Sequence, residues 1–71
     1  METISITTEF IRLQDLMKLA SLTATGGEAK VRIQGGEVSV NGEVCLQRGR
    51  KLREGDEVSF AGRTYRVIYA A

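Results

Sequence analysis

The 71-residue chain is predicted to form one α+β domain, in which two short helices pack on a small, mostly antiparallel sheet. Three observations lead to this class. An N-terminal segment alternates apolar and polar residues, and from residue 12 the apolar period becomes helical. A second helical segment lies between a capping pattern and a glycine pair. The rest of the chain alternates again around tight turns, which is typical of hairpins.

The first part of the chain is expected to hold one strand and one helix. Residues 3–7 form a strand that places Ile4 and Ile6 on one face. Residues 12–20 form a helix because an apolar stripe recurs there at i, i+3, i+4 and i+7: Leu13, Leu16, Met17 and Ala20.

The second helix is expected to begin after Thr25, which forms a capping-box pattern with Glu28. It should end at the glycine pair 35–36, where one glycine can adopt the left-handed conformation. Ala29 and Ile33 give it a buried side, and Lys30 lies on the outer side.

Four strands are predicted in the remaining sequence. Asn-Gly at 41–42 sits between alternating runs and is the strongest local signal for a two-residue hairpin. Residues 54–56 form another turn, and residues 57–60 and 64–69 form a second hairpin around Ala61 and Gly62. Cys45 is expected in a strand as a small buried apolar residue.

The composition argues against catalysis, metal binding and membrane insertion. There is no histidine to act as a general acid or base, or to activate the single cysteine. One cysteine cannot form an intramolecular disulfide or a multi-cysteine metal site. Apolar runs are far shorter than the ~18 residues that span a bilayer. We therefore expect a non-catalytic, cytoplasmic protein without a cofactor, a metal ion or a small-molecule substrate.

Positive charge is concentrated in one short segment. The chain has ten Lys and Arg against nine Asp and Glu, yet Arg48, Arg50, Lys51 and Arg53 fall within six positions. A solvated loop is one interpretation of this cluster. An RNA contact is the other, because the planar arginine side chain suits phosphate and stacks on bases, and Gly49 permits close backbone approach.

Aromatic residues do not alternate with these cations along the sequence, and we expect them in the core: Phe10, Phe60, Tyr65 and Tyr69. Surfaces that bind single strands combine the two residue types. The pattern therefore favours folded or double-helical RNA, recognised through phosphates and shape. Arg63 and Arg66, in the last hairpin, are expected to be solvated.

The order of these elements resembles the S-four RNA-binding domain, the module named after ribosomal small-subunit protein four. The resemblance extends over roughly residues 10 to 60 and rests on Arg12, Leu13, Leu16, Ala29, Ile33, Gly36, Val38, Val40, Asn41, Gly42, Leu52, Gly55, Asp56 and Val58. The stretch TGGEAKVRIQGGEVSVNGEV, with RGRKL after it, resembles in particular the stand-alone bacterial YbcJ/YaaA-type members.

The resemblance implies an αL-type RNA-binding fold, whose surface is built from the two helices and the loop beyond the hairpin. The residues expected on this surface are Arg48, Arg50, Lys51, Arg53, Lys30, Arg12, Lys18, Thr25 and Gly26. Arg12 and Lys18 are expected at its rim, and Thr25 acts first as a helix cap. Many family members have Arg directly after this cap, where this chain has Gly26, so contact there would depend on backbone N–H groups or on Lys30.

The expected partner is structured RNA such as ribosomal RNA, bound by a monomer. The rival interpretation is a protein-interaction domain that uses the same cations to dock an acidic partner.

Overall fold

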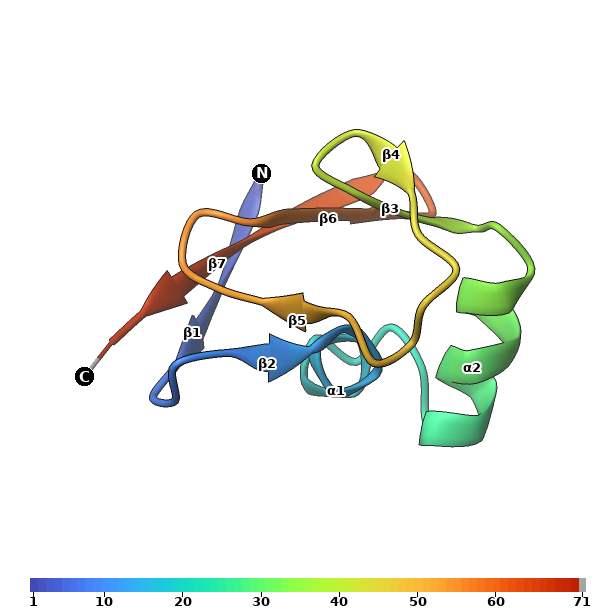
Figure 1. The fold of residues 1–71 in the computed structure, drawn as a ribbon, viewed down its shortest axis with the longest axis horizontal. Coiled ribbons are helices and arrows are strands. Elements are labelled where there is room, and N and C mark those ends of the chain that lie inside the picture. The colour runs from blue at the N-terminus through green and yellow to red at the C-terminus, as the bar shows by residue number, and fades with distance from the viewer. Residues whose placement is uncertain (71) are drawn as a thin grey trace.

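The computed structural model describes residues 1–70, in which two helices and seven strands are present. In chain order they are β1 (Glu2–Ile6), β2 (Ile11–Arg12), α1 (Leu13–Leu19), α2 (Gly26–Gln34), β3 (Val38–Val40), β4 (Glu43–Val44), β5 (Lys51–Leu52), β6 (Glu57–Phe60) and β7 (Arg63–Tyr69). Five strands form a sheet in the order β1-β7-β6-β3-β4, and β2 pairs with β5 in a separate ribbon. Figure 1 shows both helices and this ribbon on one side of the sheet. The predicted α+β class is confirmed.

Both predicted hairpins are present with the expected turns. Asn41 and Gly42 have φ of 51° and 86°, and Val40 pairs with Glu43 directly across the turn. Positive φ at both central residues is what a two-residue hairpin of this kind requires. The second hairpin turns at residues 61–62 and pairs β6 with β7 in the antiparallel sense.

Three pairings were not predicted from the sequence, and one of them joins the two hairpins by placing β3 antiparallel to β6, with Val40 opposite Val58. Strand β1 lies parallel to β7, with Ile4 opposite Val67, and so places the first and last strands of the chain side by side. Strands β2 and β5 pair over two residues each, Ile11 with Leu52 and Arg12 with Lys51. Alternation identifies a strand but not its partner, and a strand of two residues is too short to show a period at all.

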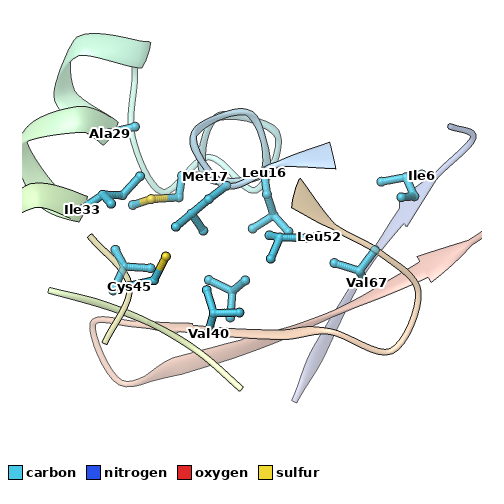
Figure 2. Packing of buried hydrophobic residues seen from close by; sticks show 12 residues of the cluster. Ile6, Leu16, Met17, Ala29, Ile33, Val40, Cys45, Leu52 and Val67 are labelled. Atoms are coloured by element: carbon cyan, nitrogen blue, oxygen red, sulfur yellow. The ribbon is translucent and has the colours of Figure 1, made fainter. Parts of the chain in front are cut away.

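The hydrophobic core fills the space between the helices and the five-stranded sheet (Figure 2). Helix α1 contributes the apolar residues of its predicted stripe except Ala20, and α2 contributes Ala29 and Ile33. Cys45 is buried as expected, although β4 ends one residue before it. Its N–H still donates to the carbonyl of Val38 at 3.0 Å, which extends the ladder.

The prediction that all four aromatic residues lie in the core was wrong for two of them. Tyr65 is buried and Phe60 packs against the core, but Tyr69 is 46% exposed and Phe10 is half-buried outside the core cluster. An aromatic residue in an alternating sequence has a core face and an exposed face available, and the pattern alone does not distinguish them. No helix within residues 1–70 is long and apolar enough to cross a membrane.

Candidate nucleic-acid interface

The cationic segment, residues 47–53, is held against the start of α1 by backbone hydrogen bonds. The N–H of Leu13 donates to the carbonyl of Arg50 at 2.9 Å, and the N–H of Gln14 donates to the carbonyl of Arg48 at 3.0 Å. The first N–H groups of a helix have no partner within the helix. Arg12, the N-cap residue, makes no side-chain capping bond, so the loop carbonyls take that role. The segment is therefore attached to α1.

The β2–β5 ribbon places three cations on one outer face. Leu52 is fully buried, and its neighbours Lys51 and Arg53 are exposed, because successive strand residues point to opposite faces. Arg12 is exposed and lies directly opposite Lys51. Directly opposed residues have Cβ atoms roughly 4.5–5.5 Å apart. Two like charges thus lie side by side at this position.

Phe10 lies beneath two of these cations. The Nζ of Lys51 is 4.8 Å from the centre of the Phe10 ring, and the Cζ of Arg53 is 5.8 Å from it. Both distances are within the range of cation–π attraction. The expectation that aromatic residues and cations remain separate fails here, because the β2–β5 pairing brings together residues far apart in the sequence. Phe10 is therefore a candidate site residue that the sequence pattern did not indicate.

The far end of the cationic segment is anchored by Asn41 and Asp56. The carboxylate of Asp56 accepts the N–H of Arg53 at 2.8 Å and the side-chain amide of Asn41 at 3.1 Å. The amide oxygen of Asn41 in turn accepts the N–H of Glu57 at 2.9 Å. The hairpin asparagine thus joins the first hairpin to the Gly-Asp turn, and this network fixes the backbone where the segment ends.

The cations of this surface form no ion pairs within residues 1–70. Within residues 1–70, ion pairs shorter than 4.0 Å are formed by Arg32 with Glu37, at 3.4 Å, and by Arg63 with Glu2, at 2.7 Å. The exposed residues around the start of α1, which we call the α1 group, form none: Arg12, Arg48, Arg50, Lys51 and Arg53. Their charge is therefore available to an external anion.

Arg63 differs from its predicted role as a solvated residue. It is exposed, but its Nε and Nη2 both donate to Oε2 of Glu2, at 2.9 and 2.7 Å. These bonds and the charge of Glu2 raise the pKa of Arg63 above its usual value. The partner lies 61 residues away in the sequence, so local pattern could not reveal it.

The start of α2 is capped by the side chain of its own N-cap residue, Thr25. The hydroxyl of Thr25 accepts the N–H of Glu28 at 3.1 Å, as the capping-box pattern predicts. The Glu28 carboxylate reaches back to the N–H of Ala24, at 2.9 Å, and not to that of the cap residue. A negative charge thus already occupies this helix end, where the helix dipole would otherwise favour a bound anion.

The predicted site residues therefore fall into two groups. The α1 group is continuous along the ribbon and the anchored segment. We call the remaining residues the α2 group. Thr25, Gly26 and Lys30 lie at α2, and Lys18 lies on α1 but lines a surface hollow together with Glu28 of α2. The α2 group therefore has less uncompensated positive charge than the α1 group.

Sequence and fold comparisons agree on the class of protein that this arrangement defines. The family model of the S4 domain matches residues 4–68. The chain therefore belongs to the S4 domain family, a family of non-catalytic RNA-binding modules. The resemblance predicted from the sequence is confirmed.

Two similar proteins cover most of the chain. One, from Bacillus subtilis (strain 168), bears the name "Probable ribosome maturation protein RlbA" and is 48% identical over 59 residues, which are 83% of each chain. The other is YbcJ of Escherichia coli (strain K12), 38% identical over 58 residues, which are 82% of this chain and 83% of YbcJ.

The solved structures confirm the fold. The solution structure of E. coli YbcJ, described as revealing an αL motif involved in RNA binding, matches with a TM-score of 0.72 and 36% identity over 96% of this chain and 87% of that one. The 30S ribosomal protein S4e of Thermoplasma acidophilum matches with a TM-score of 0.66 over 89% of this chain and 33% of its own length. Its identity of 22% supports a shared fold only.

Proposed function

We propose that the protein binds structured RNA through the α1 group, with the α2 group at the margin of the contact. The observation that carries this proposal is the pair of hydrogen bonds from Leu13 and Gln14 to the carbonyls of Arg50 and Arg48. They hold the cationic segment against a helix end, so that its side chains extend from a fixed backbone. A purely solvated loop would need no such attachment.

Electrostatics and preorganisation support the same proposal. Cations without protein partners can replace counterions on phosphates, which is the main source of affinity for nucleic acids. Binding costs less when the groups that make contact are already ordered. The α1 group meets both conditions, because its backbone is fixed at α1 and at Asp56 and its side chains form no ion pairs within residues 1–70.

Ribosomal RNA is the target that we propose. The RlbA relative is named for ribosome maturation, and the YbcJ structure is described in terms of RNA binding. We further propose that the protein acts as a monomer in the cytoplasm, where the unpaired Cys45 would remain reduced.

Measuring RNA affinity against salt concentration tests the proposal. Each phosphate contact contributes roughly 0.7–0.9 to the slope of log affinity against log salt. The variant Arg48→Gln/Arg50→Gln should lower the slope by roughly 1.5 and weaken binding to unrelated structured RNAs alike. The matched control, Arg63→Gln/Arg66→Gln, removes the same charge from β7 and should leave the slope nearly unchanged. A larger reduction of the salt slope in Arg63→Gln/Arg66→Gln than in Arg48→Gln/Arg50→Gln would contradict the proposal.

Two further measurements narrow the interpretation. Arg50→Lys keeps the charge but removes the planar donor arrangement, so a bidentate or stacked contact would weaken while the slope stays the same.

A competition experiment separates RNA from the rival acidic protein partner. Structured RNA should displace a mixed-sequence acidic polypeptide from the protein, and the polypeptide should fail to displace RNA.

A further inference from the structure

An open hollow of about 450 Å³ adjoins the α1 group and is lined by Glu9, Arg53, Glu54 and Tyr69. Its volume is in the range of roughly 300–1,000 Å³ that is usual for small-ligand sites. Arg53 belongs to both features, because its guanidinium lies over the Phe10 ring and its side chain also lines the hollow. A molecule bound along the α1 group would therefore reach the hollow directly.

The charges of the hollow do not suit a phosphate group. Two carboxylates, Glu9 and Glu54, line it against one guanidinium, that of Arg53, and none of these forms an ion pair within residues 1–70. Carboxylates only accept hydrogen bonds when ionised, and they repel phosphate. The lining is complementary to a hydrogen-bond donor without negative charge, and in RNA such donors lie on the edges of the neutral bases.

Flat surfaces for stacking are present in the same hollow. Tyr69, near the end of β7, is 46% exposed, although aromatic residues of a small domain usually contribute to its core. Unpaired RNA bases stack on aromatic rings and on guanidinium planes. Phe10 supports Arg53 by the cation–π contact at 5.8 Å, so this guanidinium is held in place before a ligand binds.

We propose that this hollow binds one unpaired base of the structured RNA, and that it prefers guanine. The base stacks on Tyr69, with the guanidinium of Arg53 beside it, and Glu9 or Glu54 accepts the two adjacent donors, N1–H and N2–H, of the guanine edge. Adenine has the same size but presents an acceptor at N1, which a carboxylate repels. The inference rests on the proposed function, because the α1 group holds the flanking phosphates.

Three RNA hairpins of equal stem length test this inference: one fully paired, one with a single bulged G and one with a single bulged A. The parent protein should bind the G-bulged hairpin about tenfold more tightly than the paired one, in line with the energy of stacking one base. The A-bulged hairpin should lie between them. Tyr69→Phe should keep this order, and Tyr69→Leu should remove most of the advantage of both bulged hairpins.

A second variant tests the carboxylates separately from stacking. Glu9→Gln/Glu54→Gln removes two negative charges, so it should bind all three hairpins more tightly and yet distinguish G from A less well. Thermal unfolding of each variant confirms that it is folded. Equal affinity of the parent for all three hairpins, within twofold, overturns the inference and leaves the proposed function intact. A bulge preference that persists in Tyr69→Leu overturns it too, and failure of the parent to bind any hairpin overturns both.

Discussion

Helices α1 and α2 satisfy the N–H groups of their first turns with different partners. In helix α2 the side chain of Thr25 accepts the N–H of Glu28, and the Glu28 carboxylate accepts the N–H of Ala24, just before the helix. Helix α1 has no side-chain cap, and it uses the carbonyls of Arg48 and Arg50 from a distant part of the chain. One helix start is self-contained, and the other is joined to the cationic segment.

Because of this difference, we expect the start of α2 to contribute mainly to stability and the start of α1 to contribute mainly to RNA binding. The cap of α2 stabilises a helix and places a carboxylate where an anion could have bound. The start of α1 leaves its neighbouring cations without ion pairs in the described part of the chain, and it fixes the backbone that carries them. Changes near α2 should therefore affect mainly the free energy of unfolding, and changes near α1 should affect mainly RNA affinity.

The largest effect is expected at Asn41, which anchors the far end of the cationic segment. Asn41→Gly keeps the positive φ of the turn but loses the bonds to Asp56 and Glu57, and should cost about 1–2 kcal/mol in the free energy of unfolding. Asn41→Ala should cost about 1 kcal/mol more because of the left-handed backbone. Denaturant unfolding measures both. RNA affinity should fall as well, because Asp56, which accepts the N–H of Arg53, loses its own bond to Asn41. An Asn41→Gly variant with parental stability would contradict the anchoring role.

Two alanine substitutions, one at each helix start, test directly whether stability and RNA affinity depend on different regions. Thr25→Ala should cost about 1 kcal/mol of unfolding free energy, as loss of an N-cap usually does, with RNA affinity within twofold of the parent. Arg12→Ala should change stability by less than about 0.5 kcal/mol, since it is an exposed residue without a capping bond, and should weaken RNA binding. If Thr25→Ala weakened binding more than Arg12→Ala, the division between the two regions would be wrong.

Much of the fold followed from local patterns. The sequence predicts features that require particular residue types at fixed spacing. These are the Asn-Gly turn, the register of Val40 with Glu43, and both caps of α2. At the C-terminal end, the N–H of Gly36 donates to Ile33 and that of Glu37 to Arg32, the motif in which a left-handed glycine ends a helix.

Pairings between distant segments could not be predicted in the same way. Phe10 came to lie under Lys51 and Arg53 only because β2 pairs with β5, and a two-residue ladder leaves no trace in the period of either segment. The four clustered cations were visible in the sequence. Their attachment to α1 was not, because it is made by backbone carbonyls, which any residue could supply.

A moderate effect on stability is expected at Cys45, a buried residue that lies outside both helix starts. Cys45→Ala or Cys45→Val should cost about 1 kcal/mol of unfolding free energy and leave RNA affinity unchanged, since Cys45 acts as a small apolar residue of the core. Loss of binding in a variant that unfolds like the parent would point to a chemical role for its thiol.

The smallest effect is expected for Gly26→Arg, which tests whether positive charge at the start of α2 contributes to RNA binding. A Cβ atom added at Gly26 meets no atom within 4 Å, so the backbone should accept the substitution without strain. Arginine is the better helix former, and a stability gain of up to about 0.5 kcal/mol is expected. With Glu28 nearby, the increase in RNA affinity should be at most a few fold. Gly26→Gln is the uncharged control. A large gain in affinity and in the salt slope would move the centre of the interface to α2.

Residue-resolved titration tests the position of the RNA surface most directly. In an NMR titration of the ¹⁵N-labelled protein with a paired RNA hairpin, we expect the largest amide shifts at residues 10–14 and 47–53. Smaller shifts should occur at residues 25–28, and the smallest on the outer face of the sheet near Arg66. Shifts centred on residues 25–28, with residues 47–53 unchanged, would contradict the assignment of the RNA contact to the start of α1 and its attached cationic segment.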